Sequence, residues 1–185
     1  IDGLWVNKTT NDTISWYTGH NYHRTDIAGI DYQLLFETIF GKSGLGVEYR
    51  YDRILSNVLG EEMAEGQPVK GLEDVYFTKS KARDHVSAFF EHSYHYQNLS
   101  LSGGLMLYWN NDYQFGTFAG FEAGYNVFNN LKIFTSINES MRIPTYTDLY
   151  YQGPENTGNH DLIPEKAVTP EAGFHWKSRV MNFKS

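Results

Sequence analysis

Several segments of this chain alternate apolar and polar side chains, and this two-residue period restricts the possible folds more than any other feature of the sequence. Neighbouring side chains of a β-strand point to opposite faces, so such a segment predicts a strand with one apolar and one polar face. From Ala28 to Phe40 the even positions are apolar except Thr38, whereas the odd positions include Asp31 and Glu37. The same pattern recurs in segments 45–52, 86–96, 99–110, 116–127, 131–140 and 171–176. The chain is therefore predicted to be all-β, with about seven antiparallel strands.

Most of these strands are expected to reach about ten residues, which is the length of a tilted strand that crosses a bilayer. Strands of ordinary globular domains average about five or six residues. The longest uninterrupted apolar run, Leu105–Trp109, is too short for a transmembrane helix. Alternation alone also fits a soluble β-domain, so the lengths of the strands and loops must decide between the two classes.

The predicted connections alternate between short and long. Short turns are expected at Gly41–Gly44, Gln97–Asn98 and Phe128–Asn130, and long loops at Leu59–Lys81 and Ile143–Glu165, with Asn110–Gln114 as an intermediate case. Outer-membrane barrels have short turns at the periplasmic rim and long loops outside. The fold class we predict is therefore an antiparallel up-and-down transmembrane β-barrel, here a partial barrel of about seven strands.

Several function classes are excluded or disfavoured by composition. The chain has no Cys, which excludes disulfides, thiolate zinc sites and thiol catalysis. Its formal net charge of −7 and the lack of a Lys/Arg cluster argue against nucleic acid as a partner. Neither a phosphate-binding glycine loop nor a nucleophile elbow is present. We therefore predict no catalytic residue, no cofactor and no enzyme activity.

The histidines and paired carboxylates do not predict a metal site. His92 and His95 are three residues apart, which places them on opposite faces of a strand, whereas His20 and His23 could meet only if their loop folded back. Glu61–Glu62 and Glu73–Asp74 are interpreted as solvated loop charges. Glu139 has the parity of the apolar face and is expected near the outer rim, where a carboxylate is tolerated.

The stretch 140–151, Ser-Met-Arg-Ile-Pro-Thr-Tyr-Thr-Asp-Leu-Tyr-Tyr, followed by 158–166 and Glu171-Ala172-Gly173, resembles the late-barrel signature of TonB-dependent outer-membrane receptors. The matching positions are Arg142, Pro144, Thr145, Tyr146, Asp148, Leu149, Tyr150, Gly158, Asn159, Leu162, Pro164 and Glu165. His160 stands where the family usually has Pro. Segments 46–50 and 58–60 also resemble an earlier hairpin of the cobalamin and iron-complex branch, so the resemblance covers most of the chain from Tyr22 to Lys177.

This resemblance implies a function in nutrient import across the bacterial outer membrane. The expected cargo is a cobalamin, a siderophore or another metal chelate, and the expected partners are outer-membrane lipid, TonB and a plug domain. Such receptors have about 22 strands around the plug. Residues 1–185 are therefore expected to be a fragment of the barrel domain of a larger receptor, without its plug.

Two groups of residues are predicted to matter in the last long loop. The candidate ligand contacts are Tyr146, Asp148, Tyr150, Tyr151, Asn156 and His160. The structural signature consists of Arg142, Pro144, Gly158, Asn159, Pro164 and Glu165. For this block we favour a latch that closes the loop over direct contact with substrate.

Two alternatives remain at the level of sequence. The first is a small complete outer-membrane barrel that acts as an anchor or adhesin, with the missing strand supplied by residues from Ile1 onward. The second is a soluble carbohydrate-binding β-sandwich. A soluble protein would pack Leu34, Phe36, Leu105 and Phe121 beneath a helix or a second sheet, whereas a membrane barrel leaves them uncovered for lipid.

Overall fold

The computed structural model describes residues 5–6, 13–14, 20–154, 156–177 and 182–184. In that part the chain is all-β apart from one short helix. The elements are β1 (Trp5–Val6), β2 (Thr13–Ile14), β3 (His23–Thr38), β4 (Gly41–Ser56), β5 (Glu61–Pro68), β6 (Tyr76–Tyr96), β7 (Leu99–Asn110), β8 (Gln114–Phe128), β9 (Leu131–Arg142), α1 (Tyr146–Tyr150), β10 (Glu165–Lys177) and β11 (Asn182–Lys184).

Two compact units divide the chain. The first, here called the loop unit, comprises Ile1–Ala28, Tyr51–Arg83 and Ile143–Pro164. The second, the sheet unit, comprises Gly29–Arg50, Asp84–Arg142 and Glu165–Ser185. None of the described helices is long and apolar enough to cross a membrane.

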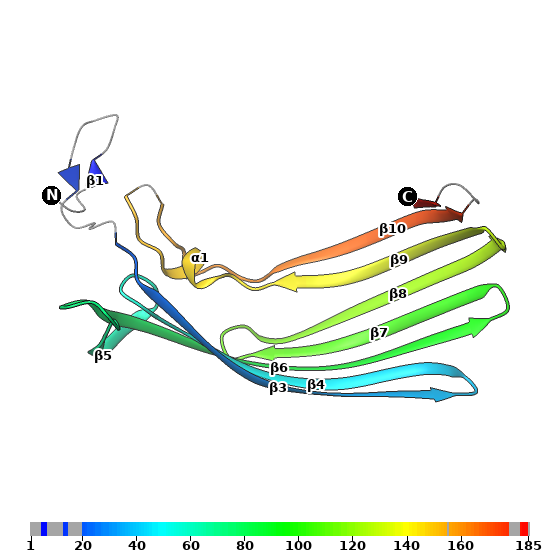
Figure 1. Ribbon diagram of the computed structural model, residues 1–185, viewed down its shortest axis with the longest axis horizontal. Helices are drawn as coiled ribbons and strands as arrows, with labels where there is room; N and C mark the ends of the chain where they lie inside the picture. The colour runs from blue at the N-terminus through cyan, green and yellow to red at the C-terminus, as the bar shows by residue number, and fades with distance from the viewer. Residues whose placement is uncertain (1–4, 7–12, 15–19, 155, 178–181, 185) are drawn as a thin grey trace. The chain divides into compact units, whose positions relative to one another are not determined.

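The main sheet has the strand order β11-β10-β9-β8-β7-β6-β4-β3, with β5 paired to β6 beside this path. Strands β6 to β10 follow one another in sequence, pair antiparallel and lie side by side (Figure 1). This is the up-and-down order that the alternation predicts. Because β11 and β3 lie at opposite ends of the order, the described strands form an open sheet, which fits part of a barrel and not a complete small one.

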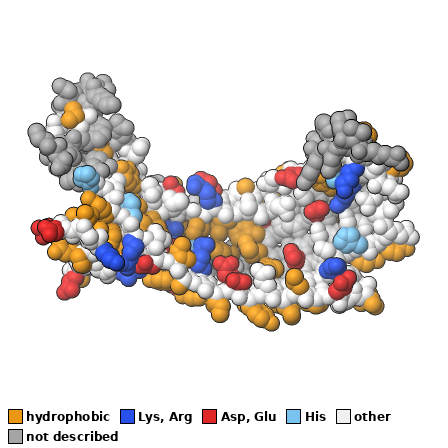
Figure 2. Space-filling model, in the orientation of Figure 1, with side chains coloured by type: hydrophobic (Ala, Val, Ile, Leu, Met, Phe, Trp, Pro, Cys, Tyr) orange, Lys and Arg blue, Asp and Glu red, His pale blue; other side chains and the backbone are white. Residues whose placement is uncertain are grey.

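One face of the sheet unit is apolar and uncovered. Leu34 is 44% exposed, Phe36 40%, Leu105 46% and Phe121 48%, so no second layer packs on them in the described part of the chain. The apolar residues share rows across the strands, with Phe90 opposite Leu105 and Phe121 opposite Ile137. Figure 2 shows hydrophobic side chains along the lower margin of the sheet. The arrangement confirms the predicted parity and is typical of a lipid-facing surface.

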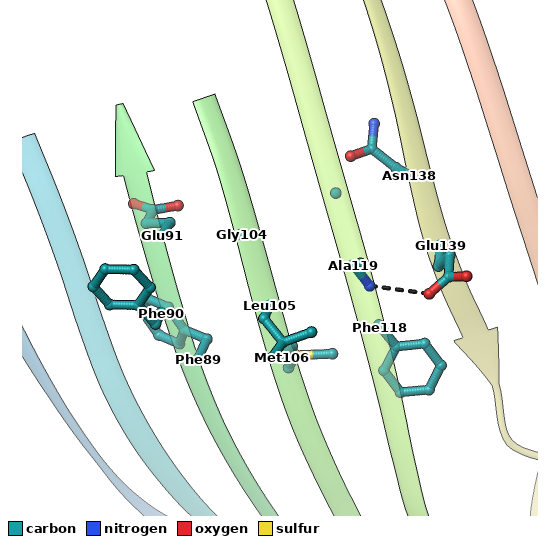
Figure 3. A pocket seen from close by; sticks show the side chains of 11 residues that line it. Phe89, Phe90, Glu91, Gly104, Leu105, Met106, Phe118, Ala119, Asn138 and Glu139 are labelled. Atoms are coloured by element: carbon teal, nitrogen blue, oxygen red, sulfur yellow. Dashed lines mark hydrogen bonds between the residues drawn. The ribbon is translucent and has the colours of Figure 1, made fainter. Parts of the chain in front are cut away.

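The β8–β9 ladder ends before its neighbours do. It stops at Gly120 opposite Asn138, whereas β9 continues to pair with β10 as far as Arg142. Beyond the last pair, the Glu139 carboxylate accepts a hydrogen bond of 3.0 Å from the Ala119 N–H (Figure 3). Glu139, the charged residue that the sequence places on the apolar face, therefore has a defined role: its carboxylate satisfies the first backbone N–H that the β8–β9 ladder leaves without a partner.

A hollow of about 260 Å³ lies next to this point and is bordered by Phe89, Glu91, Met106, Phe118 and Asn138 (Figure 3). Gly104 and Gly120 stand in register across β7 and β8 and present no side chain to fill it.

Two predicted turns are displaced. The first turn is Ile39–Phe40 and not Gly41–Gly44, because β4 already begins at Gly41. The Thr38 hydroxyl accepts from the Phe40 N–H at 3.1 Å, and Gly41 adopts a φ of 126°. The third turn begins one residue later than predicted, since Phe128 belongs to β8, whereas Gln97–Asn98 is confirmed.

The glycines that suggested the first turn have a packing role inside β4. A Cβ on Gly44 would lie 3.0 Å from the Glu91 carboxylate, and one on Gly46 would collide with the Phe89 ring. Glycine in a strand interior often marks such a close approach.

The predicted long loops are partly ordered. Most of Leu59–Lys81 forms an antiparallel arm made of β5 and the beginning of β6. The strand predicted from Val86 accordingly begins at Tyr76, and the last one begins at Glu165 and includes Pro170. Pro170 is opposite Ile137 of β9. On the other side of β10, β11 pairs only with His175–Lys177, so no described strand lies beside Pro170 there.

Candidate functional site

The loop unit contains most of the buried apolar side chains among the described residues: Ile54, Leu55, Leu59, Phe77 and Leu149. Only Phe118 belongs to the sheet unit. A loop region with a core of its own can hold polar groups in fixed positions, which is a requirement for a binding site.

The last long loop begins with a capped helical turn. Thr145 is the N-cap of α1, and its hydroxyl accepts from the Asp148 N–H at 3.1 Å, while the Asp148 carboxylate accepts from the Thr145 N–H at 2.9 Å. This capping box fixes the turn and buries Leu149. Asp148 thus has a structural role, and its predicted contact with ligand stays a prediction.

The signature residues fold the rest of the loop back onto α1. The Gly158 N–H donates to the Tyr151 carbonyl at 2.6 Å, and the Asn159 N–H donates to the Asp148 carbonyl at 2.8 Å. The Asn159 side chain accepts from the Asp161 N–H at 2.9 Å. Asn156, a predicted ligand contact, is exposed, and its carbonyl accepts from the Gly153 N–H at 2.8 Å. The latch interpretation is supported by this geometry.

Replacing Gly158 with alanine is expected to weaken loop closure by about 1–3 kcal/mol. A Cβ at this position would lie 2.7 Å from the Leu149 carbonyl carbon and 2.8 Å from the Tyr150 nitrogen, and backbone atoms cannot move aside as a flexible side chain does. Hydrogen exchange of residues 150–159 in the full-length receptor measures the effect. Gly103→Ala, whose added Cβ would have 3.7 Å of space, is the control, and equal protection in both variants would contradict the expectation.

Two further signature residues join the strands that flank the loop. Arg142 and Glu165 are paired in register at the ends of β9 and β10, and their side chains form two hydrogen bonds of 3.1 and 3.3 Å. Both side chains are exposed, so the pair contributes little stability. Pro144 is buried, and Pro164 is partly exposed just before β10.

Arg83 is the central buried cation of the loop unit, at 3% exposure. Its Nη1 donates to the Pro144 carbonyl at 2.9 Å, and its guanidinium lies 4.4 Å from the centre of the Tyr146 ring. The Tyr146 hydroxyl in turn donates to the Asp52 carboxylate at 2.7 Å. Tyr146, a predicted ligand contact, therefore ties the loop to β4 and β6. No motif or spacing in the sequence pointed to Asp52 or Arg83.

Tyr150 and His160, both predicted ligand contacts, pack edge to face with their ring centres 4.6 Å apart. They adjoin Glu61 of β5, whose carboxylate accepts a hydrogen bond of 2.8 Å from the Lys81 Nζ. The hydrogen bond and charge of Lys81 lower the pKa of Glu61 below its ordinary value, against a smaller opposing effect of burial, and Tyr150 and His160 add to the lowering. The charged form of Glu61 is thus favoured chiefly by Lys81.

Basic side chains occupy alternate positions of β6, at Lys79, Lys81 and Arg83, which places them on one face of the strand. On β5, Glu62 lies 3.4 Å from Lys79, and Glu61 pairs with Lys81. Glu61 and Glu62 are solvent-exposed, as predicted, but they belong to β5 and not to a loop, and each carboxylate is paired with a lysine of β6. Spacing along the chain could not show this pairing without the register of the arm.

The histidines considered in the sequence have separate contacts in the structure. His20 stacks on Tyr22, the His23 ring nitrogen lies 2.9 Å from the Ser56 hydroxyl, and His92 contacts the Ser43 hydroxyl at 2.8 Å. Among the residues that the structure describes, no three His, Asp or Glu side chains are grouped closely enough to hold a metal ion.

Comparison with known proteins assigns nearly the whole chain to one family. Residues 3–184 match the family described as TonB dependent receptor-like, beta-barrel. No curated protein matches the chain.

Solved structures share the fold. The siderophore receptor PirA from Pseudomonas aeruginosa aligns with a TM-score of 0.63 and 13% identity over 84% of this chain and 29% of that one. The siderophore receptor PirA from Acinetobacter baumannii aligns with a TM-score of 0.63 and 15% identity, and the alignment covers 88% of this chain and 26% of that one. A mutant of the ferric enterobactin receptor PfeA from Pseudomonas aeruginosa, in complex with enterobactin, aligns with a TM-score of 0.66 and 16% identity. The alignment covers 96% of this chain and 28% of that one. This chain therefore spans less than a third of the length of each of these proteins.

Proposed function

Because this chain belongs to the family of TonB-dependent receptor β-barrels, we propose that it forms part of an outer-membrane receptor that imports a ferric chelate of the siderophore class. Proteins of this family are receptors and transporters of the Gram-negative outer membrane. In this proposal the apolar face of the sheet unit contacts lipid, and the loop unit contributes to capture of the cargo.

The observation that carries the choice of cargo is the pair of partly exposed lysines on one face of β6 in the loop unit, Lys79 and Lys81. Cations held on an ordered framework attract anions, and many ferric chelates are anionic. The similar structures named above are receptors for siderophores or ferric enterobactin, which favours a ferric chelate over the cobalamin that the sequence also suggested.

The rest of the receptor is proposed from its family and from the share of the solved proteins that this chain spans, which is 26% to 29%. Residues 1–185 supply part of the barrel wall and loops, while further strands and a plug domain come from the full-length receptor. Import uses energy delivered through TonB, so the proposal includes no covalent chemistry.

Deleting the gene of the full-length receptor tests this function. Cells grown under iron limitation are given a radiolabelled iron(III) tris-catecholate or a neutral iron(III) tris-hydroxamate. We expect uptake of at least one chelate to fall in the deletion strain, to return with the intact gene and to stop when TonB is absent. Unchanged uptake of both chelates and unchanged growth would refute the proposed function.

A further inference from the structure

The acidic and basic residues of the β5–β6 arm lie at different depths. The side chains of Lys79 and Lys81 are 23% and 21% exposed, whereas those of their partners Glu62 and Glu61 are 75% and 65% exposed. The carboxylates therefore stand outermost and partly cover the ammonium groups. An anion that approaches the lysines from solvent meets the carboxylates first.

Glu61 is held close to Lys81 by a hydrogen bond of 2.8 Å that the Lys81 Nζ donates to its carboxylate. Because β5 pairs with β6 in register at Glu61 and Ser80, Glu61 lies beside Lys81 although its side chain is 65% exposed. An internal anion held at 2.8 Å competes directly with any external anion for the same Nζ donors.

Resting on the proposed function, we propose that Glu61 and Glu62 determine the charge selectivity of the receptor. They neutralise Lys79 and Lys81 internally, so only a ligand with several negative charges gains enough attraction to displace them. A neutral chelate has no net charge for the lysines to attract, so removing the carboxylates changes its binding little. Selectivity thus depends on Glu61 and Glu62, which compete with the ligand for the lysines. This competition discriminates against ligands that carry little negative charge.

The test compares the full-length receptor with its Glu61→Gln/Glu62→Gln variant, both purified in detergent. Binding of a trianionic iron(III) tris-catecholate and of a neutral iron(III) tris-hydroxamate is measured by titration at low and high salt. The variant is expected to bind the trianion roughly three- to tenfold more tightly, the change that two exposed ion pairs can produce. Salt should reduce this gain, and binding of the neutral chelate should not change.

A Glu65→Gln/Glu73→Gln variant is the matched control, because it removes two carboxylates from the same arm region without touching either lysine pair. The inference is supported if only Glu61→Gln/Glu62→Gln tightens the trianion. It is overturned, with the proposed function intact, if the wild type binds a chelate but the variant gains nothing, gains equally for both chelates, or gains no more than the control. A wild-type receptor that binds neither chelate overturns the inference together with the function. Heat-modifiable mobility on gels verifies that each variant is folded.

Discussion

Replacing Phe121 with arginine is expected to destabilise the barrel by about 2–4 kcal/mol, the range for a cationic side chain on the lipid face at the bilayer midplane. Phe121 is the central residue of β8 and lies on the uncovered apolar face, opposite Ile137. The substitution removes an aromatic contact with lipid and forces a guanidinium into hydrocarbon or toward the interface. Urea unfolding of the full-length receptor in lipid vesicles, followed by fluorescence, measures the change.

Ser136→Arg is the control for this experiment. Ser136 lies on the opposite face of β9, in register with Glu122 of β8 and Glu171 of β10, so an arginine there meets carboxylates and not lipid. We expect less than half of the loss seen with Phe121→Arg. If the two variants lose the same stability, the apolar face of the sheet does not contact lipid.

Replacing Arg83 with methionine is expected to loosen the last long loop by about 2–4 kcal/mol, from the loss of a hydrogen bond by a charged donor and of a cation–π contact. The donor to the Pro144 carbonyl disappears, and the Tyr146 ring loses the guanidinium above it. Hydrogen exchange of residues 145–163 in the full-length receptor reports the loosening. Methionine fills a similar space, so the effect is not that of an empty cavity.

Two companion variants separate the contacts of Arg83. Arg83→Lys keeps the charge and one donor but not the planar stack on Tyr146, so an intermediate effect is expected. Tyr146→Phe keeps the ring and removes only the donation to Asp52, which is worth about 1 kcal/mol. Unaltered exchange in Arg83→Met would show that these contacts do not hold the loop.

The strands were predictable from sequence because one face of the sheet is apolar and the other is polar, and this difference requires side chains to alternate along each strand. Residues such as Leu34, Leu105 and Phe121 face one side and their neighbours the other, and any slip by one residue would exchange the two faces. Turn positions were less predictable. Gly44 and Gly46 look like turn residues, yet they serve close packing against Glu91 and Phe89, which are brought near only by the strand order.

The candidate site divides in the same way. The latch around α1 depends on neighbours in sequence, such as Thr145 and Asp148, and was therefore accessible from a local motif. Tyr146 and Asp52 are 94 residues apart, and Arg83 and Pro144 are 61 residues apart. No local spacing encodes these contacts. The role of the predicted ligand residues in binding stays a prediction.

The early end of the β8–β9 ladder has a consequence for how loops of this kind diversify. Past Glu139, β9 and β10 continue as a ribbon of two strands, from the Glu139–Val168 pair to the Arg142–Glu165 pair. Two-stranded ribbons twist more strongly than wide sheets, so the direction in which such a ribbon delivers its loop varies with its length. Insertion of two residues into each arm keeps every side chain on its face while it re-aims the loop. The Glu139 carboxylate thus marks the point where the wide sheet ends and a two-stranded ribbon, whose length sets the direction of the loop, begins.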